Sequence, residues 1–342
     1  MPDLLYIPFN NLYTLLDSLS TAYEIFVPVK KGNQRYYVNY SGSKEEIVVG
    51  EVRAFEPLKS FFTRAREVVA QDFSECSPVS AKKPFCIVGA KACDLKGFLV
   101  HDHVFSNHDY PDPFYLRFRE ENLIISSDCT CTIETCFCCA VGILPYPQNN
   151  FDINLSRVGD GFIAESGSEK GKKIIEDNAP FFEDAHDRQI SKRQALRIRV
   201  RDEVNANISA NCIPAQESFS GIIERNWESA LWQDEAKTCV ECGACTAICP
   251  TCHCFLLYDQ ENQGQMARLR TWDSCMLKDY ARVAGGANPR GKLWMRLRNR
   301  FEKKFDYFPK VANFYACTGC GRCITACPAK IDIRKVLKNL VG

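Results

Sequence analysis

The chain has 342 residues, which predicts about two domains at roughly 150 residues each. Lys and Arg number 43 and Asp and Glu 42, so a net charge of +1 argues against a nucleic-acid-binding protein and a polybasic membrane anchor. Hydrophobic residues make up 46 % of the chain and charged residues 25 %, as in a globular protein that can build a core.

Residues 1–165 are predicted to form an N-terminal α/β domain. Apolar residues at helical spacing indicate helices over residues 11–22, 57–69 and 94–104. Runs rich in Val, Ile, Phe and Tyr indicate strands over residues 24–29, 35–38, 85–89 and 123–127. A hairpin is expected over residues 150–166. Strands that alternate with helices are typical of an α/β layer.

Residues 166–230 are predicted to connect this domain to a second one. The charged segment 184–205 is expected to be a solvated helix. Residues 231–342 are expected to form a ferredoxin-like domain, for the reasons that follow, with a helical insertion over residues 251–314. The fold class is therefore an N-terminal α/β domain followed by a dicluster bacterial-ferredoxin-like domain, a mixed α/β and α+β architecture.

Cysteine is unusually frequent, with 20 residues. A secreted disulfide scaffold is usually a short chain, and no charged segment followed by an apolar one, as in a secretory signal, is visible at the start. No apolar stretch is long enough to cross a bilayer. We therefore expect a reducing, cytoplasmic location and cysteines that bind metal.

Two copies of one cysteine motif stand in the C-terminal part. Residues 239–250 and 317–328 both read C-x2-C-x2-C-x3-C-P. This is the pattern of two-cluster bacterial ferredoxins, in which the fourth cysteine of each motif binds the other motif's [4Fe–4S] cluster. Two zinc sites are the alternative, but zinc needs no terminal Cys-Pro.

The exchange of the fourth cysteine predicts both ligand sets. The set for cluster 1 is Cys239, Cys242, Cys245 and Cys327. The set for cluster 2 is Cys317, Cys320, Cys323 and Cys249. The insertion adds Cys252, Cys254 and Cys275, which are candidates for a further cluster or, alternatively, buried thiols beside the first two clusters.

A third group of cysteines lies in the N-terminal domain. Cys93 and Cys129 each follow a predicted strand, and the ends of parallel strands converge on one edge of a sheet. Together with Cys136 and Cys138 they are expected to form a four-thiolate site for a third cluster, or for zinc. Reduced structural thiols are the alternative. Five cysteines receive no role, namely Cys76, Cys86, Cys131, Cys139 and Cys212.

These residues carry a resemblance that runs nearly from end to end. The sequence resembles the family of iron–sulfur subunits that anaerobic sulfite reductases share with archaeal sulfhydrogenases, where the member is the beta subunit. The shared features are Glu56-Pro57-Leu58-Lys59, Ala90-Lys91-Ala92-Cys93-Asp94-Leu95, Cys129-x6-Cys136-Phe137-Cys138, Gly159-Asp160-Gly161, the first motif continuing into Pro250-Thr251-Cys252-His253-Cys254, Trp272-Asp273-Ser274-Cys275, Ala284-Gly285-Gly286 and the second motif.

The resemblance implies a role in electron transfer. Such a protein relays electrons between a flavoprotein that takes hydride from NAD(P)H and a terminal sulfite reductase, hydrogenase or heterodisulfide-reductase-type partner. It also supports the third cluster at Cys93, Cys129, Cys136 and Cys138. No residue is expected to be catalytic, and no G-x-G-x-x-G follows a strand, so we expect neither flavin nor nicotinamide to be bound by this chain alone.

Two alternatives stay open. The chain could itself be a reductase, with chemistry at an unusual cluster held by Cys252, Cys254 and Cys275, or a structural zinc protein.

The basic segment 290–304 is expected to be an amphipathic helix with a solvated face, or a docking surface for an acidic partner.

Overall fold

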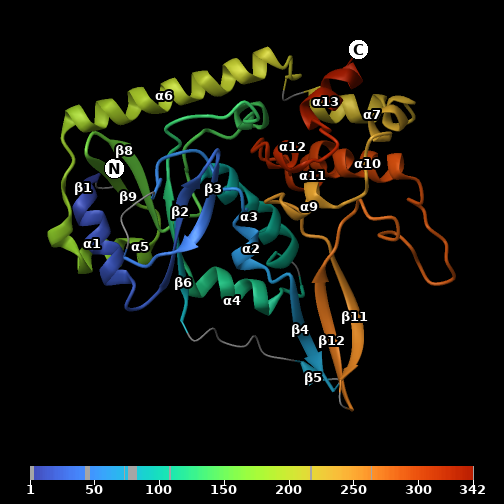
Figure 1. Cartoon of the computed structure of the whole chain (residues 1–342), viewed down its shortest axis with the longest axis horizontal. Helices are drawn as coiled ribbons and strands as arrows, with labels where there is room; N and C mark the ends of the chain where they lie inside the picture. The colour runs from blue at the N-terminus through green and yellow to red at the C-terminus, as the bar shows by residue number, and fades with distance from the viewer. Residues whose placement is uncertain are drawn as a thin grey trace.

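The computed structural model describes residues 4–42, 47–72, 74–75, 83–107, 109–215, 218–262 and 264–341. It shows an N-terminal sheet with helices on both faces and a mainly helical C-terminal part (Figure 1). A long helix runs from one part to the other. The expected fold class, with an N-terminal α/β sheet followed by a C-terminal part with helices around the two cysteine motifs, is confirmed. Cys76 lies outside the described residues.

The main sheet has eight strands in the order β10-β1-β9-β8-β7-β6-β2-β3. The central pairs β2–β6, β6–β7 and β7–β8 are parallel, and the other pairs are antiparallel. The strands are β1 (Leu5–Pro8), β2 (Glu24–Lys31), β3 (Gln34–Asn39), β6 (Phe85–Ala90), β7 (Leu123–Ser127), β8 (Ile153–Val158), β9 (Gly161–Ser166) and β10 (Glu183–Asp184).

Helices cover both faces of this sheet. Cys86 and Val88 of β6 face α1 and α5, whereas Ile87 between them faces α2, α3 and α4. This alternation of side chains explains why β6 and β7 are apolar throughout. The helices are α1 (Phe9–Leu19), α2 (Lys59–Phe62), α3 (Ala92–Phe105), α4 (Pro113–Glu121) and α5 (Glu169–Asp177), with short turns η1 (Cys138–Val141) and η2 (Ala179–Phe181).

Most predicted elements of this domain are confirmed within a few residues, but the helix over residues 57–69 is wrong. Only α2 is helical there, and β4 (Arg66–Gln71) follows it. The β-branched Val68 and Val69 favour a strand, and β4 finds its partner in β12, about 200 residues further along the chain. A pairing this distant leaves no signal in the local pattern.

A second sheet joins the two parts of the chain. It has the order β11-β12-β4-β5, in which β4 and β5 (Ser74–Glu75) come from the N-terminal part. The hairpin of β11 (Phe255–Asn262) and β12 (Gln265–Trp272) extends away from the helices (Figure 1). The insertion after the first motif is therefore not wholly helical as expected, because it opens with this hairpin.

The remaining helices surround the two cysteine motifs. The charged segment forms α6 (Asp187–Ala210), which runs from the main sheet to the C-terminal helices (Figure 1). The others are α7 (Phe219–Arg225), α8 (Leu231–Ala236), α9 (Ala244–Ala247), α10 (Leu293–Glu302), the π-helical turn η4 (Lys303–Tyr307), α11 (Phe308–Ala312), α12 (Arg322–Ala326) and α13 (Ile333–Val341). None of the described helices has the length and apolar character needed to span a membrane.

Candidate iron–sulfur centres

The cysteines of the two C-terminal motifs line two adjoining cavities. The first-motif cavity is bordered by Cys239, Cys242, Cys245 and Cys327, together with Cys323. The second-motif cavity is bordered by Cys249, Cys317, Cys320 and Cys323. Each cavity thus brings together the four cysteines of one predicted set, with Cys323 lining both cavities, and the assignment of these cysteines as ligands stays a prediction.

Turns with left-handed backbone start the helix that follows each motif's second cysteine. Gly243 has φ of 72° immediately before α9, and Gly321 has φ of 69° immediately before α12. A β-carbon at Gly321 would also lie 2.2 Å from the carbonyl oxygen of Thr135. Glycine is therefore required there by both backbone conformation and close packing.

The predicted N-terminal set also meets in one place. An N-terminal cavity is lined by Cys93, Cys129, Cys136 and Cys138, and by Cys131 and Cys320 as well. Cys131 is thus a fifth N-terminal thiol at this cavity, which sequence reasoning left without a role. The parallel strands β6 and β7 explain the meeting, because Cys93 and Cys129 follow their neighbouring carboxyl ends.

Lys91 fixes the two strand ends relative to each other. Its ammonium group is buried and donates to the carbonyl oxygen of Val49 at 2.7 Å, the hydroxyl of Ser127 at 2.5 Å and the carbonyl oxygen of Asp128 at 3.2 Å. Burial lowers the pKa of Lys91, while the thiol of Cys129 acts in the opposite direction. Three acceptors satisfy all three of its protons.

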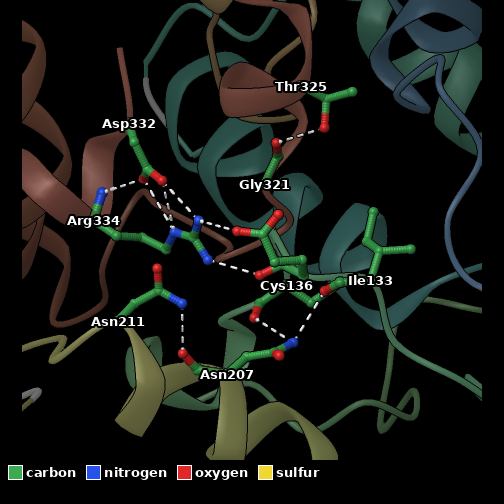
Figure 2. Close-up of polar contacts among 9 residues, drawn as sticks. Ile133, Cys136, Asn207, Asn211, Gly321, Thr325, Asp332 and Arg334 are labelled. Atoms are coloured by element: carbon green, nitrogen blue, oxygen red, sulfur yellow. Dashed lines mark hydrogen bonds and ion pairs between the residues drawn. The ribbon is translucent and has the colours of Figure 1, made fainter. Parts of the chain in front are cut away.

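The loop that carries Cys136 is clamped from several sides. The side-chain amide of Asn207 in α6 donates to the carbonyl oxygen of Ile133 at 3.0 Å, and Asp332 holds Arg334 of α13 (Figure 2). Arg334 in turn donates to the carbonyl oxygen of Glu134 at 2.7 Å. The amide of Phe137 donates to the carbonyl oxygen of Gly319 at 2.8 Å. The N-terminal loop therefore rests directly on the second motif.

A buried ion pair makes the same connection. Arg322 of the second motif lies 2.8 Å from Asp94, which follows Cys93, and both side chains are at most 1 % exposed. Arg322 also donates to the carbonyl oxygens of Ala54 and Phe55. Removing one partner of a buried ion pair strongly destabilises the folded protein. This pair therefore fixes the N-terminal cavity against the second motif.

Three cations on α10 and η4 point inward: Arg300 and Lys304 lie beside cysteines, whereas Arg296 pairs with Glu241. Arg296, Arg300 and Lys304 lie four residues apart and are buried, so they share one face of the helix. The expectation of a solvated basic face is therefore wrong for these three residues. The ammonium group of Lys304 lies 3.3 Å from the sulfur of Cys249. In the sequence, the spacing of i, i+4 and i+8 indicates that the three cations share one helix face, but it does not show whether that face is buried or exposed.

Several buried polar groups around the second motif lack a partner among the described residues. The Nε and Nη2 atoms of Arg300, Nη1 of Arg322 and the hydroxyl of Thr318 are buried without a hydrogen-bond partner. Arg300 and Thr318 line the second-motif cavity. Burial of a cation with unused donors is costly unless an anionic acceptor is supplied. A cluster with sulfide and thiolate sulfur atoms would supply such acceptors, so these residues fit the group.

Electrostatics in the cavities agree with this fit. Burial opposes the charged form of Lys304, but the sulfurs of Cys249 and Cys252 outweigh that effect and raise its pKa. Burial raises the pKa of Cys317 to about 12 and of Cys323 to about 11. These thiols are therefore protonated until a metal displaces the proton. Among the described residues, no three His, Cys, Asp or Glu side chains converge as a single metal ion requires.

The insertion cysteines do not share one cavity. Cys252 shares a hydrogen bond with Cys249, and Cys254 shares one with Cys275. Cys252 and Cys254 line a separate cleft, together with Cys242, whereas Cys275 is not among its lining residues. A further cluster on these three cysteines stays a prediction. Of the cysteines without a predicted role, Cys86 is buried in the sheet, Cys139 is half-buried and Cys212 is exposed.

Comparison with known proteins agrees with these centres. Residues 238–331 match the family model of a 4Fe-4S dicluster domain. The chain is thus an iron–sulfur protein with at least two 4Fe-4S clusters. It is 31 % identical over 318 residues to the sulfhydrogenase 2 subunit beta of Pyrococcus furiosus, covering 92 % of each chain. The chain belongs to the iron–sulfur subunit family that includes this protein.

Proposed function

We propose that this chain is the electron-transfer subunit of a multi-subunit oxidoreductase. The observation that carries the proposal is the continuity of the three cavities. The N-terminal cavity shares Cys320 with the second-motif cavity, which shares Cys323 and Arg300 with the first-motif cavity. Bound [4Fe–4S] clusters take up and release single electrons, and cavities that share a wall would keep three such centres close together.

The proposed ligands follow from the lining residues. Cys239, Cys242, Cys245 and Cys327 hold cluster 1. Cys317, Cys320, Cys323 and Cys249 hold cluster 2. Cys93, Cys129, Cys136 and Cys138 hold cluster 3, and Cys131 is the rival fourth ligand there. Around these ligands the buried cations offset the negative charge of thiolates and sulfides, which makes reduction easier.

The domain division is proposed with the same boundaries as the sequence indicates. Residues 1–165 carry the N-terminal cavity, residues 166–230 connect, and residues 231–342 carry both motifs. The pairing of β4 with β12 and the ion pair of Arg322 with Asp94 bind the two domains into one unit. Such an arrangement suits a relay, because distances between centres in the two domains are held constant.

The first-motif cavity is the end of the path nearest the surface. Cys242 is exposed, and Val240 beside it has 64 % of its surface accessible. We propose that a partner subunit docks here. One partner is a flavoprotein that takes electrons from NAD(P)H, and the terminal partner is a hydrogenase, sulfite reductase or heterodisulfide-reductase-type subunit. The named relative, a sulfhydrogenase subunit, favours the hydrogenase, and a cytoplasmic complex is the setting proposed.

Iron and acid-labile sulfide per chain, measured with zinc after anaerobic purification, test the proposal. About 12 iron atoms, at four per cluster, are expected. About 8 would show that the N-terminal cysteines are structural or bind zinc, and the path would end at cluster 2. About 16 would place a fourth cluster at Cys252, Cys254 and Cys275 and favour the rival function, a reductase with its own reaction centre.

A further inference from the structure

A pair of cysteines at the base of the β11–β12 hairpin has no role in the relay. Phe255 and Trp272 form the last paired residues of the hairpin, and the amide of Asp273 still donates to the carbonyl oxygen of Cys254 at 2.9 Å. Cys275 follows two residues later and shares a hydrogen bond with Cys254. The hairpin therefore brings the two thiols close enough that each perturbs the other, lowering the pKa of Cys254 and raising that of Cys275.

The pair lies against the first motif. Ser274, the neighbour of Cys275, accepts a hydrogen bond from the hydroxyl of Thr246 at 2.7 Å. A β-carbon on Gly243 would lie 3.3 Å from the hydroxyl oxygen of Ser274, so the two backbones pack closely. Cys275 is itself only 4 % exposed. The pair therefore packs beside the segment that carries the first-motif cysteines.

Cys254 also faces a cleft open to solvent. The cleft has a volume of about 220 Å³, and its wall includes Lys59, His101, His253, Cys252 and Cys254. The hydroxyl of Tyr280 lies 3.6 Å from the sulfur of Cys254. Protons released from the pair would have a polar neighbour and a route to water, which a fully enclosed structural thiol pair would not have.

We propose that Cys254 and Cys275 form a reversible dithiol–disulfide couple that exchanges two electrons with cluster 1. The inference rests on the proposed function. In the oxidising direction, both S–H bonds would break, one S–S bond would form and two protons would leave through the cleft. The two electrons would pass singly to cluster 1, which would hand the first on to cluster 2 before it accepted the second. The reverse step consumes two electrons and two protons. The couple would store a pair of electrons beside one-electron carriers.

Redox-poised alkylation of the full-length, cluster-loaded protein tests the couple. The protein is equilibrated with mediators at a series of potentials, quenched in acid, alkylated with N-ethylmaleimide and digested for mass spectrometry. We expect a peptide pair linked through Cys254 and Cys275, with a linked-to-free ratio that changes 100-fold over about 60 mV, the slope of a two-electron couple. Cys275→Ser should abolish the link and leave the iron content unchanged. The exposed control Cys212→Ser should leave the iron content unchanged without abolishing the link.

Three results would overturn the couple. Loss of about four iron atoms in both Cys275→Ser and Cys254→Ser would assign these cysteines to a cluster. Free thiols at every potential in a wild-type protein with full iron content would make them structural. A link that changes only upon loss of iron would be a by-product of cluster damage. Failure of the relay itself would show separately, as a low iron and sulfide content in the wild-type protein.

Discussion

Replacing Lys304 by methionine removes a buried positive charge from beside a ligand of cluster 2. Its ammonium group lies 3.3 Å from the sulfur of Cys249 and 2.9 Å from the hydroxyl of Thr251. Reduction adds one negative charge to the centre, and a nearby cation stabilises the reduced form more than the oxidised one. The midpoint potential of cluster 2 should therefore fall in Lys304→Met.

The structure bounds the size of this effect. A unit charge at 3.3 Å in an effective dielectric of about 20 is worth about 5 kcal/mol, or about 200 mV for one electron. The added electron is spread over the whole cluster rather than placed on one sulfur atom. The expected shift is then a third to a half of that bound, about 70–100 mV toward negative potential.

A redox titration followed by EPR measures this shift. Lys304→Arg keeps the charge and should stay within about 30 mV of the wild type. Lys310→Met is the matched control, because it removes a cation of α11 that is exposed and paired with Glu224 and Asp306. A shift in Lys304→Met no larger than in this control, or a shift upward, would refute the assignment of a charge-compensating role.

Three further predictions concern the connection between the N-terminal cavity and the second motif. Gly319→Ala should remove about four iron atoms per chain, because its β-carbon would lie 2.5 Å from the Cα of Cys138. Gly285→Ala, where φ is also positive but no atom lies within 4 Å, should keep them, and equal losses would contradict the packing argument. Asp94→Asn should lower the free energy of unfolding by about 3–5 kcal/mol, since it leaves the buried Arg322 unpaired, and urea denaturation that shows under about 1 kcal/mol would contradict this. Asn207→Leu should speed iron loss to a chelator by about tenfold, because the loop loses roughly 1–1.5 kcal/mol of hydrogen bonding. Asn205→Leu, which changes an exposed residue of the same helix, should not speed it. Matching rates in the two variants would show that α6 does not hold the cysteine loop.

The sequence predicted the parts of this protein that follow from local spacing. Both cysteine motifs, the central strands β6 and β7, and helices α1 and α3 carry periodic signals that do not depend on distant residues. The cysteines at the ends of β6 and β7 were found because parallel strands end at one edge.

Elements that depend on distant partners were missed. Strand β4 is stabilised by β12 of the insertion, so its residues looked helical when read alone. The inward face of α10 and η4 was read as solvated, because a stripe of cations at helical spacing looks the same whether it meets water or thiolates. Lys91 and Arg322 belong to the same class, since their acceptors come from other segments of the chain.

EPR of the fully reduced protein tests most directly whether the three cavities form one electron path. The wild type should give broadened, fast-relaxing signals from clusters that interact magnetically. Cys317 lines the second-motif cavity and neither of the other two cavities. Cys317→Ala should therefore leave clusters 1 and 3 with the sharp signals of isolated centres. A wild-type spectrum equal to the sum of isolated signals, and unchanged apart from the lost cluster in Cys317→Ala, would contradict the relay.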